Sequence, residues 1–122
     1  EYLKDNKQVE WVRFPGLPDD PSHALNEKYL SGLGGPMVVF GIKGGLEAGK
    51  SFIEGVSMFS HLANVGDAKS LAIHPATTTH SQLTPDQQGD AGISPELVRL
   101  SVGIEHIDDI IEDIDKGLAA AK

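Results

Sequence analysis

The segment Leu97–Glu105 alternates apolar and polar side chains and gives the clearest strand pattern in the chain. Val98, Leu100 and Val102 fall on one face of this strand, and Arg99 falls on the other. An arginine inside a strand must face water or find a partner, because burying an unpaired charge is costly. Two interpretations therefore stay open. Arg99 is an ordinary solvent-facing residue, or the sheet holds its guanidinium as a fork for a carboxylate or phosphate.

Hydrophobic periodicity predicts the remaining elements of the chain. Continuous apolar runs predict strands at residues 37–42 and 71–73, with a further short strand within 58–65. Amphipathic patterns predict helices at residues 1–12, 21–31, 46–56, 84–92 and 105–120. The last helix is the most regular, with an apolar stripe formed by Ile104, Ile107, Ile110, Ile111, Ile114 and Leu118. Strands separated by helices predict an α/β sandwich (α+β), with one small, mostly antiparallel sheet covered by helices on one face.

Helix-start signals support two of the shorter predictions. Asp20 followed by Pro21 is typical of a capping aspartate with proline at the first helical position. Thr84, Pro85 and Gln87 form a capping-box pattern. We therefore expect helices to begin at both places.

Composition and charge exclude several classes of partner. The 122 residues are enough for one domain, and their formal net charge of −8 argues against nucleic acid and against an anionic membrane surface. Much of the acid lies within residues 105–115, which we interpret as a solvated helix face. No cysteine is present and no apolar run approaches the length of a membrane span, so we expect a cytoplasmic protein.

The sequence indicates only part of one candidate binding site. His61, His74 and His80 match no zinc-binding spacing, so no metal site is expected. The glycine-rich stretches match neither a dinucleotide-binding nor a P-loop pattern. What remains is Arg99, together with polar loops at 64–67 and 77–80. This combination suggests an anion-binding half-site and lacks the parts of a complete catalytic centre.

Three segments resemble a known family. They are Ala63–Leu71 (ANVGDAKSL), His74–His80 (HPATTTH) and Arg99–Glu105 (RLSVGIE). In order and spacing they resemble the C-terminal domain of the Cys/Met-metabolism family of fold-type-I pyridoxal-phosphate enzymes, over essentially the whole chain. Asn64-Val65, Thr78 and residues 103–109 look most like the O-acetylhomoserine sulfhydrylase branch of that family.

The resemblance implies roles for four residues. Arg99 would bind the α-carboxylate of the amino-acid substrate, and Asn64 would assist it. Thr79 and His80 would belong to the loop that lines the substrate entrance. Residues 1–122 would form the single C-terminal small domain, with residues 1–12 as the end of an interdomain helix. The catalytic and cofactor-binding residues would lie in a larger domain absent from this chain, so we expect the fragment alone to be inactive.

The resemblance also implies a reaction and its partners. The parent enzyme would use pyridoxal 5′-phosphate as an electron sink and replace the acetate of O-acetylhomoserine with sulfide, as a homotetramer in methionine and cysteine biosynthesis. A cystathionine γ-synthase, cystathionine γ-lyase or methionine γ-lyase is an alternative within the family. The chain begins within a pattern and lacks the family's Schiff-base lysine motif, so a non-catalytic interaction fragment is an alternative of another class.

Overall fold

The computed structural model describes residues 1–121 and contains one four-stranded sheet. The helices, including the 3-10 helix η1, are α1 (Tyr2–Asp5), α2 (His23–Leu30), α3 (Gly45–Gly55), η1 (Pro75–Thr77), α4 (Pro85–Asp90) and α5 (Ile107–Ala120). The strands are β1 (Val9–Arg13), β2 (Met37–Ile42), β3 (Leu71–Ile73) and β4 (Leu97–Ser101).

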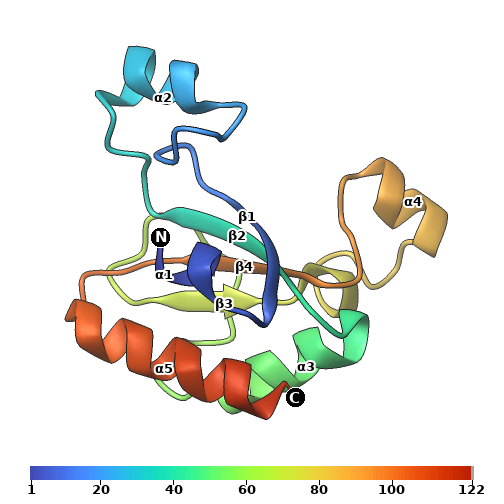
Figure 1. Ribbon diagram of the computed structural model, residues 1–122. Coiled ribbons are helices and arrows are strands. Elements are labelled where there is room, and N and C mark those ends of the chain that lie inside the picture. Colours follow the sequence, from blue (N-terminus) through green and yellow to red (C-terminus); the bar gives the residue numbers. More distant parts are fainter. Residues whose placement is uncertain (122) are drawn as a thin grey trace.

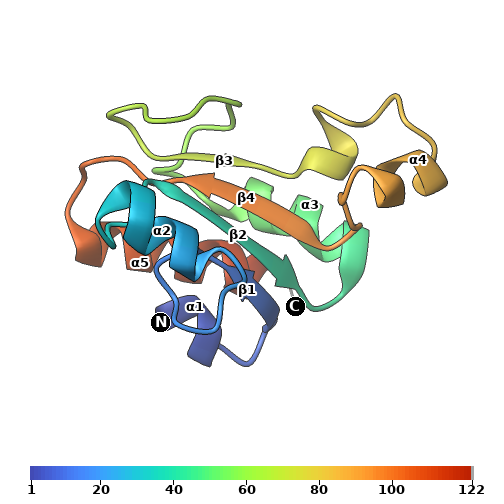
Figure 2. The ribbon, with the colours of Figure 1, turned by 90° about the horizontal axis from the view of Figure 1, so that it is seen from above.

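The sheet is antiparallel throughout, in the order β1-β2-β4-β3. Helices α3 and α5 lie side by side against one face of it, whereas α2 and α4 extend away from the sheet on loops (Figure 1). Seen from above, β2 and β4 occupy the middle of the sheet (Figure 2). The predicted sandwich, with its small antiparallel sheet covered on one face, is confirmed.

The core lies between the sheet and the α3–α5 pair. Phe40 of β2 meets Phe52 of α3 edge to face, with ring centroids 5.4 Å apart and planes at 77°. Such a pair contributes about 1 kcal/mol beyond the apolar area it buries. Gly117 of α5 lies against the Phe52 ring, and an added Cβ there would come within 2.7 Å of ring carbons. The absent side chain at Gly117 thus allows the two helices to approach closely.

Two predicted elements are wrong. The predicted helix 1–12 ends at Asp5, because Val9–Arg13 instead pairs with β2 as an edge strand. Valine and tryptophan favour strands, and the available partner decides the outcome. The expected strand within 58–65 is reduced to an isolated bridge between Ser60 and Leu71. The chain beyond Ser60 lies in an exposed loop.

The acidic C-terminal segment also differs from its prediction. The helix begins at Ile107 instead of residue 105, and Ile104 is 86% exposed, so it does not belong to the apolar stripe. Ile107 is 59% exposed. Asp113, assigned to the solvated face, is 1% exposed. It lies on the buried side of α5 because it bonds backbone groups of the segment after α3.

Of the two predicted helix caps, the one at Thr84 is confirmed and the one at Asp20 is wrong. The capping box at Thr84 is present, with both reciprocal hydrogen bonds formed to Gln87. At α2 the N-cap is Ser22, and Asp20 instead accepts hydrogen bonds from the backbone N–H groups of Phe14 and Ser22. Asp20 therefore fastens the preceding loop and does not cap the helix. No helix within residues 1–121 has the length and apolar character needed to cross a bilayer.

Candidate functional site

Arg99 lies at the centre of β4, on the sheet face opposite α3 and α5. Its neighbours Val98 and Leu100 point into the core and are almost completely buried, which fixes the register of the strand. Across the sheet, Arg99 is paired with Ile73 on one side and Val39 on the other. The Arg99 side chain is half-buried. The sheet thus holds the base of the side chain rigidly and leaves the guanidinium accessible.

The structure brings Asn64 to Arg99. One guanidinium nitrogen of Arg99 donates to the backbone carbonyl of Asn64, at 3.4 Å. The Asn64 side chain bonds within its own loop, accepting from the N–H of Val65 and donating to Asp67. Within residues 1–121 the guanidinium makes no other hydrogen bond. Its remaining N–H groups can therefore serve a planar carboxylate, which matches the fork geometry of arginine.

Thr79 and His80 follow η1 and are not joined to this pair. The Thr79 hydroxyl and Nδ1 of His80 bond to each other at 2.8 Å. The backbone of His80 is held by Pro75 and by the side chain of Gln88 from α4. Neither residue makes a hydrogen bond to Arg99 or Asn64. Their membership of an entrance loop remains a prediction.

His74 has a structural environment. It is buried, with Nδ1 bonded to the Thr77 hydroxyl at 2.8 Å and Nε2 to the carbonyl of Pro95 at 2.7 Å. Burial lowers the pKa of His74, so the neutral ring is favoured. Both nitrogens are therefore already in use. The described residues contain no cluster of three side chains that could hold a metal ion.

Glu105 is a residue whose role the sequence reasoning missed. It was assigned to the solvated acidic run, yet its carboxylate accepts from both the backbone N–H and the hydroxyl of Ser70, each at 2.8 Å. The Ser70 backbone N–H lowers the pKa of Glu105 most strongly, and burial opposes it to a lesser degree. A signal was available, because Glu105 lies in the short connection between the Arg99 strand and the last helix.

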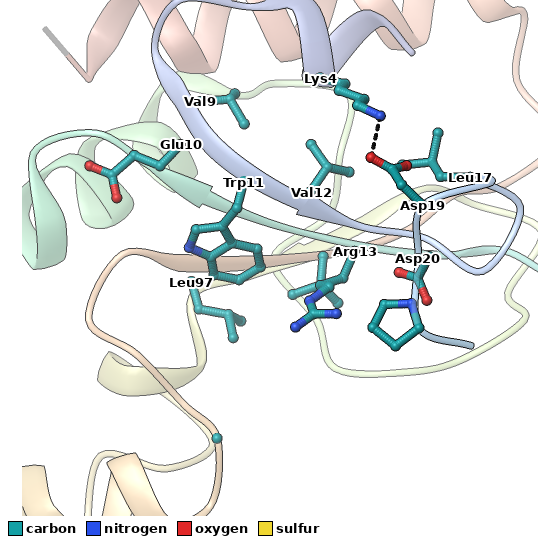
Figure 3. Close-up of a pocket in the computed structure, with 13 residues that line it drawn as sticks. Lys4, Val9, Glu10, Trp11, Val12, Arg13, Leu17, Asp19, Asp20 and Leu97 are labelled. Atoms are coloured by element: carbon teal, nitrogen blue, oxygen red, sulfur yellow. Dashed lines mark hydrogen bonds and ion pairs between the residues drawn. The ribbon is translucent and has the colours of Figure 1, made fainter. Parts of the chain in front are cut away.

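A hollow beside β1 has a volume of about 960 Å³. Trp11, Arg13 and Leu97 lie on one side of it, and the Lys4–Asp19 ion pair, 2.6 Å long, closes another (Figure 3). None of the four residues assigned to substrate binding lines this hollow. Its lining does include Val39, the strand partner of Arg99.

The described residues do not fit a covalently bound pyridoxal phosphate. A lysine that forms a Schiff base needs an enclosed or electropositive setting that lowers its pKa. Every lysine within residues 1–121 is exposed. Lys43, which follows β2, donates to the backbone carbonyl of Lys7 at the surface. The described residues therefore offer no covalent anchor for that cofactor.

Comparison with known proteins identifies the family. The profile of the Cys/Met metabolism PLP-dependent enzymes matches residues 1–119. The chain belongs to this family. The resemblance noted in the sequence is thereby confirmed, and pyridoxal phosphate is the cofactor of the family.

The similar proteins include sulfhydrylases and a lyase. The chain is 53% identical to O-acetyl-L-homoserine sulfhydrylase 1 of Thermus thermophilus, over 97% of this chain and 28% of that protein. It is 55% identical to O-acetyl-L-homoserine sulfhydrylase of Leptospira meyeri, over 97% and 27% of the respective chains. It is 45% identical to L-methionine gamma-lyase of Pseudomonas putida, over 99% and 30%.

A solved structure agrees with this placement. It is a protein of Campylobacter jejuni assigned as an O-acetylhomoserine (thiol)-lyase, which carries a pyridoxyl-lysine phosphate. The TM-score is 0.88 with 34% sequence identity, over 97% of this chain and 28% of the other. The chain thus spans about 28% of the length of these relatives.

Proposed function

We propose that this chain forms the substrate-carboxylate-binding domain of an O-acetylhomoserine sulfhydrylase. The observation that carries the proposal is Arg99, which the sheet holds half-buried with most of its N–H groups unused. The sulfhydrylases of Thermus and Leptospira, each more than half identical to this chain, support the choice of branch. The parent protein would replace the acetate of O-acetylhomoserine with sulfide and form homocysteine.

In this proposal, Arg99 orients the substrate. Its guanidinium binds the α-carboxylate through two parallel hydrogen bonds, and this fixes the amino acid relative to the reacting carbon. The carbonyl of Asn64 holds one edge of the guanidinium, so that the fork faces the substrate in one orientation. Thr79 and His80 line the entrance to the site. Pyridoxal phosphate is held by the remainder of the protein, outside this chain.

The activity is tested on the full-length protein that contains this chain. Homocysteine formation from O-acetylhomoserine and sulfide is measured beside cystathionine formation with cysteine. We expect sulfide to be strongly preferred. A preference for cysteine would move the protein to a cystathionine γ-synthase activity. Absence of turnover with either nucleophile, despite bound cofactor, would contradict the proposed reaction.

The role of Arg99 is tested by Arg99→Lys and Arg99→Ala in the same protein. Both variants should raise KM for O-acetylhomoserine by about tenfold or more, since lysine keeps the charge but loses the fork. Arg13→Lys is a matched control. Arg13 lies on the same sheet face as Arg99, because Arg13 pairs with Val39 and Val39 pairs with Arg99. Unlike Arg99, it is exposed. Unchanged KM in both Arg99 variants would remove Arg99 from the site.

Methionine γ-lyase is the second candidate, favoured by the 45% identity to the Pseudomonas putida protein. It would release methanethiol from methionine, and assaying this release in the same preparation separates the two activities. A non-catalytic interaction fragment is the alternative of another class. It would be favoured if the complete open reading frame contained no lysine motif for the cofactor.

Assembly and location complete the proposal. We infer that the full-length protein is a cytoplasmic homotetramer, as the resemblance to the family implies. Sedimentation of the full-length protein tests the assembly, and cell fractionation tests the location. A stable monomer, or a protein recovered with the membrane fraction, would contradict the corresponding part.

A further inference from the structure

The loop that carries Asn64 has few contacts of its own to hold it against Arg99. Residues 61–69 are mostly exposed, and their side-chain hydrogen bonds are local. Asp67, for example, accepts from the backbone N–H of Lys69 at 3.1 Å. Local turns shape a loop but do not fix its distance from a strand elsewhere in the fold. The position of Asn64 must therefore be set where the loop ends.

Both ends of the 61–69 loop converge on Ser70, which is 0% exposed. At the start of the loop, the backbone N–H of Ser60 donates to the carbonyl of Ser70, at 3.0 Å. At the other end, the Ser70 hydroxyl accepts from the N–H of Gly103, at 2.9 Å. The N–H of Ile104 donates to the carbonyl of Ala68. The end of the loop is thus bonded to the segment that leaves the Arg99 strand.

Glu105 anchors this junction. Its two carboxylate oxygens accept separately from the backbone N–H and the hydroxyl of Ser70, each at 2.8 Å. Hydrogen bonds to an ionised acceptor are the stronger kind, and two of them in parallel also fix direction. A Cβ at Gly103 would collide with the carbonyl of Ala68, so only glycine allows the approach. Glu105 is six positions after Arg99 and clamps the loop whose carbonyl holds that arginine.

We propose that Glu105, acting through Ser70, is a positioning residue for the Arg99–Asn64 site. This inference rests on the proposed function, because it assumes that Arg99 binds the substrate carboxylate. Glu105 does not touch the substrate. It sets the place of the Asn64 carbonyl and so the orientation of the guanidinium.

The test uses Glu105→Gln in the full-length protein. The amide keeps the shape of the side chain but replaces one acceptor oxygen with a donor, so at least one bond to Ser70 is lost. We expect KM for O-acetylhomoserine to rise about tenfold, with kcat nearly unchanged. Ser70→Ala should act in the same direction. It keeps the proposal testable if the Glu105 variant does not fold.

Asp113→Asn is the matched control. It removes another carboxylate anchor, one that bonds the backbone of residues 57–59 and makes no hydrogen bond to residues 61–69. A purely structural role for Glu105 would make the two variants alike. We expect Asp113→Asn to leave KM unchanged. Equal KM values in the Glu105→Gln and Asp113→Asn variants would overturn the proposal.

A second readout does not depend on activity. Trypsin can cut after the exposed Lys69, at the end of the loop. In Glu105→Gln, cleavage at this bond should accelerate relative to the other tryptic sites, because the local opening becomes easier. Asp113→Asn should not show this selective increase. An unchanged relative rate at Lys69 in Glu105→Gln would contradict the clamp.

The double variant that carries Glu105→Gln and Arg99→Lys tests the role of Glu105 separately from the proposed function. If Glu105 acts through Arg99, Glu105→Gln should change KM little in the Arg99→Lys background. Additive effects of the two changes would overturn the inference alone. If Arg99→Lys itself leaves KM unchanged, the proposed function fails, and the proposed role of Glu105 fails with it.

Discussion

Asp113 Oδ1 accepts hydrogen bonds from both the backbone N–H and the hydroxyl of Ser57, each at 2.8 Å. Its other oxygen accepts from the N–H groups of Met58 and Phe59, at 2.9 and 3.0 Å. The carboxylate of α5 thus binds three successive backbone N–H groups after α3. A buried charge with this many partners is compensated, and removing the charge leaves those partners unsatisfied.

Asp113→Asn should lower the free energy of unfolding by about 2–4 kcal/mol. The amide group places a donor against N–H groups that need an acceptor. Urea denaturation of the variant and of the protein without the substitution measures this difference in the free energy of unfolding. Asp109→Asn, on the exposed face of the same helix, should change stability by less than about 0.5 kcal/mol. Equal losses in the two variants would contradict the anchoring role.

Stability should fall at acidic pH because of Asp113 and Glu105. Burial alone would raise the pKa of Asp113, but the hydrogen bonds from Phe59, Ser57 and Met58 outweigh it and hold the pKa below its ordinary value. The Ser70 backbone N–H lowers the pKa of Glu105. The unfolded chain then binds more protons than the native chain, so stability rises with pH through this range.

The expected profile is therefore flat above about pH 5, with a loss of stability as the pH falls through the lowered native pKa values. Urea denaturation at successive pH values measures it. In Asp113→Asn, stability should depend less on pH below about pH 5. A slope identical to that of the parent would show that Asp113 does not contribute.

Gly117→Ala should destabilise the protein by about 1–3 kcal/mol, although alanine favours helices. The added methyl would meet the Phe52 ring in the tight crossing of α3 and α5. Gly89→Ala is the matched control in α4, where nothing lies within 4 Å of an added Cβ. It should be neutral or stabilising by up to about 1 kcal/mol. Thermal denaturation of both variants decides between crowding and helix propensity.

Thr84→Ala should weaken α4 without unfolding the sheet. The capping box ties the Thr84 backbone N–H to Gln87 Oε1 at 3.0 Å, and the Thr84 hydroxyl accepts from the Gln87 N–H at 3.3 Å. Loss of an N-cap costs about 1 kcal/mol, which corresponds to roughly fivefold faster amide exchange in that helix. Hydrogen exchange of the Gln87 amide measures this. Thr84→Ser, which keeps the hydroxyl, should exchange at the rate of the parent.

Part of the candidate site was accessible from the sequence. The alternation of β4 places Arg99 on the face opposite Val98 and Leu100, because side chains in a strand alternate with period two. The residues themselves indicated the loop 64–67, and the resemblance to the family gave Asn64 its expected role. Only the structure brings the Asn64 carbonyl to the guanidinium. Glu105 was missed because an acidic run looks the same whether or not one member folds back on a neighbouring segment.

By itself the sequence determined the elements whose signals are local: the apolar run of β2, the amphipathic helices α3 and α5, the strand of Arg99 and the capping box of α4. Tertiary structure decided the rest. Val9–Arg13 became a strand because β2 offered a partner, and Asp113 became buried because free N–H groups faced it. Periodicity reports which side of an element is apolar. It does not indicate which distant segment that element will contact. Contacts between distant segments place Asn64 beside Arg99 and Ser70 beside Glu105.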